Sequence, residues 1–219
     1  MKKISITFCD DDSQVVNVSV KEENGNTWRN RITMDSFVGA LMESQKTEDF
    51  IVFGAMPEGY VTGAVCPKYP NQRRVTLQLP AARRPVLYYG KVYNIPFPSL
   101  VFHFETGKNG SLTRSLCYAA GNSRITENSS LYKYPFGNVY NSAKICWGNI
   151  DSPRIESFAD FEKLLPLFFG SETNNDLWSS SNVNCDVKTQ RELLEALSKK
   201  DKFPAEWLVL QTTFAENLS

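Results

Sequence analysis

Strand-like alternation of apolar and polar residues fills the first half of the chain, and helical periodicity returns only near its end. Two tracts, ENGN at 23–26 and TGKNG at 106–110, have the composition of hairpin turns. The runs that we predict as strands are 3–8, 15–20, 28–33, 51–54, 60–65, 75–79, 86–93, 100–105 and 111–119. Strands first and helices last predict an α+β fold with an antiparallel sheet.

Two late segments have the spacing of helices. Residues 157–170, SFADFEKLLPLFFG, repeat aromatic and leucine side chains at helical intervals, and Pro166 is expected to kink or divide this helix. Residues 188–199, KTQRELLEALSK, form an amphipathic pattern with three leucines on one face. A shorter helix, capped by Thr33 or Asp35, is predicted near the end of the first strand group.

Two further segments bear on the domain organisation. The tract PAARRP at 80–85 is polar and bounded by prolines, so we interpret it as a turn between two parts of the chain. This divides the protein into a mostly-β N-terminal extension or subdomain at 1–79 and a main domain at 80–219. Residues 121–149 are rich in Ser, Asn, Gly and aromatic residues without clear periodicity, and such long irregular segments in compact domains are usually functional or mobile.

Charge and hydropathy exclude several classes of protein. Lys and Arg together number 24, as do Asp and Glu, so the formal net charge is zero. Whole-chain electrostatics therefore give no support to nucleic-acid binding, which usually needs a basic excess. The apolar run in the N-terminal MKKISITFCDDDSQ is too short for a signal peptide, and no later run has the length of a membrane span. We expect a soluble cytoplasmic protein with no membrane association.

The cysteines and the single histidine indicate no metal site. The five cysteines are irregularly spaced, odd in number and without a C-x-x-C pair, so neither a disulfide framework nor a zinc site is predicted. His103 lies in a predicted strand, where we expect a hydrogen-bonded or exposed histidine rather than a functional one. No metal or other cofactor is expected. The cysteines that we assign to packing are Cys9, Cys66, Cys117 and Cys185.

The fifth cysteine, Cys146, lies in the irregular tract YPFGNVYNSAKICWGN at 134–149. A loop cysteine is accessible as a thiolate nucleophile, although it could equally be a partly buried residue of a β-connection. Asn138 could steady a tetrahedral oxyanion, a contribution of about 2.7–4 kcal/mol in measured oxyanion holes, or it could simply cap a turn. Gly137 before it permits tight backbone geometry.

The tract resembles the active site of ubiquitin-conjugating (UBC) enzymes. Those enzymes carry a His-Pro-Asn motif whose Asn lies eight residues before the catalytic cysteine, and a helix follows. Here Phe136-Gly137-Asn138 occupies the motif, and Asn138 precedes Cys146 by the same eight residues. The resemblance implies a UBC-like antiparallel meander sheet with flanking late helices. It also implies a catalytic pair in which Cys146 carries a thioester and Asn138 stabilises the oxyanion.

Longer segments resemble a narrower bacterial family. They are PAARRPVLYYGKVYNIPFPSLVFHF at 80–104, LYKYPFGNVYNSAKICWG at 131–148 and FFGSETN at 168–174. They are similar to prokaryotic ubiquitin-conjugating-like family D, the protein B family of the ParB-related, ThiF-related (PRTRC) cassette. The resemblance implies a plasmid or mobile-element setting in bacteria. Its implied partners are a ubiquitin-like modifier, a ThiF-type activating enzyme and a JAB-type peptidase.

Two departures from these families leave two functions open. Phe136 and Gly137 replace the His and Pro of the motif, and residues 171–175 lack a histidine that the bacterial family carries after its late aromatic helix. The first function is a conjugating enzyme that accepts the modifier on Cys146 from the activating partner and transfers it to an amine. The alternative, which the departures favour, is a catalytically inactive UBC-like binding or scaffold module.

Overall fold

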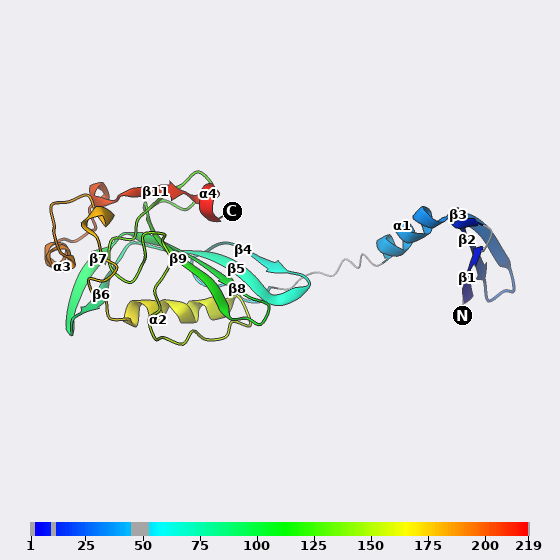
Figure 1. Cartoon of the computed structure of the whole chain (residues 1–219), viewed down its shortest axis with the longest axis horizontal. Coiled ribbons are helices and arrows are strands. Elements are labelled where there is room, and N and C mark those ends of the chain that lie inside the picture. The colour runs from blue at the N-terminus through cyan, green and yellow to red at the C-terminus, as the bar shows by residue number, and fades with distance from the viewer. Residues whose placement is uncertain (1–2, 10–11, 45–52, 219) are drawn as a thin grey trace. The chain divides into compact units, whose positions relative to one another are not determined.

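The computed structural model describes residues 3–9, 12–44 and 53–218 (Figure 1). The chain divides into two compact units, Met1–Val52 and Phe53–Ser219, which are described separately below. Within the described residues, none of the helices combines the length and apolar character needed to cross a membrane.

The first unit is a three-stranded antiparallel sheet with one helix. Its elements are β1 (Lys3–Cys9), β2 (Asp12–Lys21), β3 (Thr27–Thr33) and α1 (Met34–Ser44). The strands pair in the order β1-β2-β3, and Gly25 takes the left-handed φ of 88° that the β2–β3 turn needs. Thr33 caps α1, because its Oγ1 accepts a hydrogen bond from the Ser36 N–H at 3.2 Å. The predicted strands, hairpin and helix of this segment are confirmed.

The second unit is built on a six-stranded antiparallel sheet in the order β11-β10-β9-β8-β5-β4. Its strands are β4 (Tyr60–Cys66), β5 (Tyr69–Leu79), β8 (Ser99–Thr106), β9 (Leu112–Ala120), β10 (Ser130–Tyr132) and β11 (Leu210–Thr213). A separate hairpin consists of β6 (Ala82–Tyr88) and β7 (Lys91–Phe97). The mixed α+β, UBC-like fold class is confirmed. The strand predicted at 51–54 lies partly outside the described residues, and 53–54 are not in a strand.

The structure changes two details of the predicted organisation. Strands β4 and β5 belong to the second unit, since β5 pairs with β8 from Arg74 opposite Glu105 to Leu79 opposite Leu100. The compact units therefore divide after Val52, not at residue 79. The tract PAARRP is also not a turn over its whole length, because β6 begins at Ala82.

One face of the large sheet is covered by the late aromatic helix. A 3-10 turn, η1 (Ala159–Lys163), leads into α2 (Leu164–Gly170), and the division falls before Pro166 rather than at it. Pro166 is the third residue of α2, where a missing N–H costs no hydrogen bond within that helix. The Phe168 ring meets Phe102 of β8 edge to face, with centroids 5.2 Å apart. Figure 1 shows α2 lying along the sheet.

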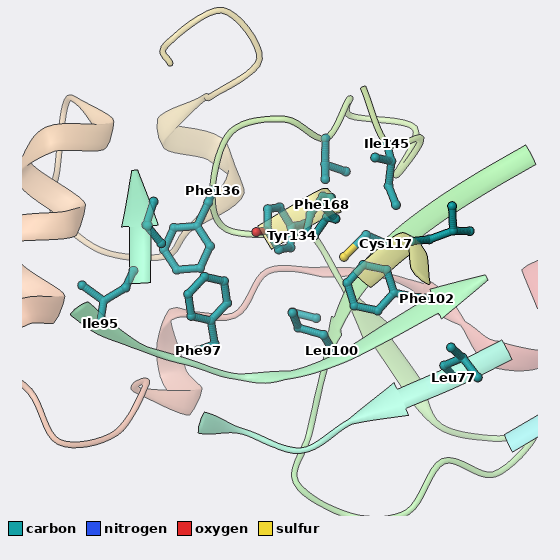
Figure 2. Close-up of a cluster of buried hydrophobic side chains, with 14 of the residues drawn as sticks. Leu77, Ile95, Phe97, Leu100, Phe102, Cys117, Tyr134, Phe136, Ile145 and Phe168 are labelled. Atoms are coloured by element: carbon teal, nitrogen blue, oxygen red, sulfur yellow. The ribbon is translucent and has the colours of Figure 1, made fainter. Parts of the chain in front are cut away.

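The same hydrophobic core includes the β6–β7 hairpin and α3 (Gln190–Ser198). Thr189 caps α3 by accepting a hydrogen bond from the Glu192 N–H at 3.2 Å, and the three predicted leucines of this helix are buried. In Figure 2, Phe97 of β7 lies against Phe136, and their ring centroids are 4.6 Å apart. The remaining elements are η2 (Ser180–Asn182), η3 (Ala205–Trp207) and α4 (Phe214–Leu218). Phe214 of α4 belongs to a second cluster of buried residues, with Val101 of β8.

Candidate active site

The segment from Asn138 to Cys146 is a tight hairpin. The backbone N–H of Cys146 donates to the Asn138 carbonyl at 2.8 Å, and the Tyr140 N–H donates to the Lys144 carbonyl at 2.9 Å. The Ala143 N–H closes the turn on the Tyr140 carbonyl at 2.8 Å, and Ala143 takes a left-handed φ of 64°. The eight-residue step between Asn138 and Cys146 thus brings their backbones into direct contact.

The returning arm of this hairpin is fixed to strand β9. The Ile145 N–H donates to the Ser115 carbonyl at 2.9 Å, and the Cys117 N–H donates to the Ala143 carbonyl at 2.9 Å. The Trp147 indole N–H donates to the Ser115 hydroxyl at 2.9 Å. These bonds extend the antiparallel sheet along β9, so the position of Cys146 is set by the main sheet.

Alternation along the hairpin directs its polar residues away from the core. Val139 and Ile145 form an antiparallel bridge, and both are buried in the main core. Figure 2 shows Ile145 in the group of core side chains. Asn138 and Cys146 flank this bridge and keep part of their surface exposed. Because side chains alternate between the faces of paired strands, the amide and the thiol lie on the same, outer face of the hairpin.

Asn138 is held by its backbone and by its side chain. Its φ of 67° lies in the left-handed region, which Asn enters more readily than most residues with a Cβ. Its Nδ2 donates to the Glu172 carbonyl at 3.0 Å, which orients the amide. An amide nitrogen carries two hydrogens, and the described part of the chain provides the second with no acceptor. One oriented N–H therefore remains available to a bound group.

Gly137 is needed because of close packing. A Cβ at this position would lie 2.3 Å from the Thr173 Oγ1, 2.8 Å from the Asn174 carbonyl oxygen and 2.9 Å from the Gln190 Oε1. The segment 171–175, where the sequence lacks the family histidine, therefore lies directly against the Asn138 loop. Thr173 is itself fixed, since its N–H donates to the Leu87 carbonyl at 2.8 Å.

Cys146 is partly exposed, and its sulfur has one polar neighbour that the sequence analysis did not select. The Tyr140 hydroxyl donates to the Cys146 Sγ at 3.7 Å, and this hydrogen bond raises the pKa of Tyr140. The sequence contains a pattern that could have selected Tyr140. Tyr140 is two residues after Asn138, so alternation places it on the same face of the hairpin as Asn138 and Cys146.

The other cysteines and the histidine lie elsewhere. Cys117 is fully buried in the main core, Cys185 packs against that core, and Cys66 in β4 is partly exposed. The side chain of Cys9 is outside the described residues. His103 is buried on the opposite face of β8 from Phe102 and Phe104. Its Nδ1 lies 2.9 Å from the Thr76 hydroxyl and its Nε2 lies 3.0 Å from a Glu105 carboxylate oxygen, so it is the hydrogen-bonded histidine that was predicted.

Comparison with known protein families identifies the family of the chain. The sequence profile of prokaryotic E2 family D matches residues 37–211. This range includes most of the second unit, with the Asn138–Cys146 hairpin and the aromatic helix that follows it. Comparison with curated proteins and with solved structures finds no match.

Proposed function

The chain belongs to prokaryotic E2 family D, and we propose that it accepts a ubiquitin-like modifier as a thioester on Cys146 and transfers it to an amine. The observation that carries the proposal is the 2.8 Å hydrogen bond between the Cys146 N–H and the Asn138 carbonyl. This backbone bond places a residue with a partly exposed thiol opposite a residue with an oriented side-chain amide in one short hairpin.

The first proposed step is thioester exchange with an activating enzyme of the ThiF type. The Cys146 thiolate attacks the modifier's C-terminal thioester carbonyl on that enzyme, a new C–S bond forms, and the partner's thiolate leaves. Trp147 and the β9 contacts fix the backbone beside the sulfur. The chain needs no metal or nucleotide of its own for this exchange, because ATP is consumed in the preceding activation.

The second step is attack by an amine on the Cys146 thioester. The nitrogen adds to the carbonyl, and the resulting oxyanion accepts a hydrogen bond from the remaining N–H of the Asn138 amide. The tetrahedral intermediate then expels the Cys146 thiolate, and the amine's proton passes to solvent. The Tyr140 hydroxyl, 3.7 Å from the sulfur, can donate a hydrogen bond to the departing thiolate. Charge-assisted hydrogen bonds of this kind are stronger than neutral ones.

Unusual backbone conformations in the Asn138–Cys146 hairpin support the proposal that it is a functional site. Among the described residues, three non-glycine residues have positive φ, and two of them, Asn138 and Ala143, lie in this hairpin. Strained backbone of this kind tends to cluster at functional sites. The wider setting that we propose is a PRTRC-type cassette of a bacterial plasmid or mobile element, with a JAB-type peptidase that removes the modifier.

The test is a reconstituted reaction of protein, modifier, activating enzyme and ATP. We expect an adduct that thiols cleave, which Cys146→Ala abolishes and the control Cys66→Ala retains. Asn138→Asp keeps a residue that tolerates left-handed φ but lacks the N–H donor. It should form the adduct and discharge it to amines about 10²–10³-fold more slowly. An adduct that survives Cys146→Ala would refute the thioester assignment.

The alternative is a UBC-like module that binds the modifier or its activating enzyme without chemistry. The replacement of the motif His and Pro by Phe136 and Gly137 favours it, as does the absence of a histidine at 171–175. It predicts binding of the modifier without any thiol-sensitive adduct. Under this reading, Asn138→Asp and wild type should behave alike in the same reaction.

A further inference from the structure

Gln190 is a buried polar side chain beside the candidate site that the proposed reaction steps do not use. It is the first residue of α3, and none of its surface is exposed. Its Nε2 donates to the Thr173 Oγ1 at 3.1 Å, and its Oε1 lies 2.9 Å from the place that a Cβ on Gly137 would take. Within the described residues, no group donates a hydrogen bond to this Oε1. The two polar atoms of one amide therefore contact two segments, one that contains Thr173 and one that leads into Asn138.

The Thr173 segment orients the side chain of Asn138. The carbonyl of Glu172, the residue before Thr173, accepts the hydrogen bond from the Asn138 Nδ2 at 3.0 Å. This carbonyl and the Thr173 N–H belong to one planar peptide group, and that N–H donates to the Leu87 carbonyl at 2.8 Å. A displacement of Thr173 would therefore move the Glu172 carbonyl with it, and the Asn138 amide would lose its orientation.

Contacts from two elements hold this segment in place. From the β6–β7 hairpin, the Gly90 N–H donates to a Glu172 carboxylate oxygen at 2.7 Å. From the same hairpin, the Tyr88 hydroxyl donates to the Asn175 Oδ1 at 3.0 Å. The hydrogen bond from Gln190 adds a contact from α3. The position of the Glu172 carbonyl thus depends on α3 as well as on the hairpin.

The start of α3 is a rigid support for Gln190. Thr189 caps the helix through the Glu192 N–H, and the Glu192 Oε2 accepts a hydrogen bond from the Lys188 N–H at 2.8 Å, which is the reciprocal arrangement of a capping box. The leucines of the helix are buried in the main core. Because its backbone is fixed in this way, Gln190 can determine where the segments that it contacts lie.

We propose that Gln190 is a positioning residue for the Asn138 amide, acting through its contacts with Thr173 and Gly137. The proposal rests on the proposed function, in which that amide stabilises the oxyanion. Cys146 is held separately, because its arm of the hairpin is bonded to β9. Loss of the Gln190 amide should therefore slow transfer to an amine and leave loading of the modifier unchanged.

The first measurement needs no partner protein. In a proton–nitrogen correlation spectrum of the full chain, the side-chain amide signals of Asn138 are identified by their loss in Asn138→Asp. Gln190→Met keeps the length and approximate volume of the side chain but removes the donor, so it should shift these signals. Thr173→Ala, which removes the acceptor, should shift them too, whereas Thr173→Ser keeps the acceptor and should leave them near the wild-type positions. The control Leu197→Met changes a buried residue about two turns further along α3 and should not shift them.

The second measurement is single-turnover discharge of the Cys146 adduct to an amine. Gln190→Met should load as wild type does and discharge about 10-fold more slowly, because the displacement is smaller than the 1 Å that can reduce a rate about 100-fold. In the Asn138→Asp background, Gln190→Met should cause no further slowing, since the N–H that it positions is already gone. Leu197→Met should discharge at the wild-type rate.

The two measurements separate this proposal from the proposed function. Asn138 signals that do not move in Gln190→Met would overturn the positioning role, whatever the reaction does. Equal slowing by Gln190→Met with and without the Asn138 amide would indicate a general structural effect and would also overturn it. Shifted signals in a protein whose wild type forms no adduct would support the positioning contact and refute thioester transfer. Thermal unfolding checks each variant, and if Gln190→Met does not fold, Thr173→Ala is compared with Thr173→Ser in both measurements.

Discussion

Replacing Gly137 by alanine should separate the two steps of the proposed reaction. The new Cβ would lie 2.3 Å from the Thr173 Oγ1, about 1.1 Å short of the 3.4 Å at which ordinary contact begins. Rotation of Thr173 does not solve this, because the Asn174 carbonyl oxygen would still be only 2.8 Å from the Cβ. The Asn138 loop must therefore move by about 0.6–1.1 Å, depending on whether Thr173 rotates. We expect destabilisation of about 1–3 kcal/mol, as for other overpacked sites.

The displacement should affect transfer more than loading. Cys146 lies on the arm that β9 holds, so it should still form the adduct. The amide of Asn138 lies on the arm that moves, and a misplacement of about 1 Å can reduce a rate about 100-fold. The assay is single-turnover discharge of preloaded protein to an amine, together with urea unfolding. Gly121→Ala is the control, because its Cβ would meet nothing within 4 Å. Wild-type stability and discharge in Gly137→Ala would refute the packing argument.

Three further predictions follow from individual side chains. Tyr140→Phe removes the donor to the sulfur and should slow discharge about 10- to 100-fold in a single-turnover assay, and an unchanged rate would exclude a role for the hydroxyl. A thiol reagent should label Cys146 in the folded protein. It should reach Cys117 only on unfolding, because Cys117 is fully buried and burial raises its pKa. Equal labelling rates for the two cysteines in the folded protein would contradict the structure. Burial lowers the pKa of His103 despite its hydrogen bond to Glu105, so this histidine is protonated at a higher pH in the unfolded state than in the folded state. Stability to urea should therefore decline from about pH 6.5 downwards, and His103→Gln should flatten the profile below about pH 6.5.

The sequence predicted the turns and helices whose own residues favour the conformation that they adopt in the fold. The ENGN and TGKNG turns and the helix capped by Thr189 contain the residues that their geometry requires. The β6–β7 hairpin was predicted as one strand, because its turn places Tyr89 at a φ of 45°, a conformation rare for a bulky residue. The pairing of β5 with β8 could not be read from periodicity, which shows that a strand exists but not which strand it joins.

The hairpin of the candidate site was not predicted, because its turn also lacks the residues that usually signal one. The resemblance selected Asn138 and Cys146, but the tract between them was taken as irregular. Its turn has Ala143 in the left-handed position where glycine is usual, so the hairpin signal is missing from the sequence. The requirement for Gly137 depends on Thr173 and on the neighbouring chain, and these contacts exist only after α2 brings that segment back to the loop.

The hairpin gives a physical reason for the amide and the thiol to share one face. Val139 and Ile145 must face the core, since both are buried and bridged to each other. The residues that flank them, Asn138 and Cys146, then share the outer face. A one-residue slip in the pairing of either arm would turn the amide or the thiol into the core. The replaced His and Pro of the motif do not enter this constraint, so Phe136 can pack in the core while Asn138 stays opposite Cys146 in the hairpin.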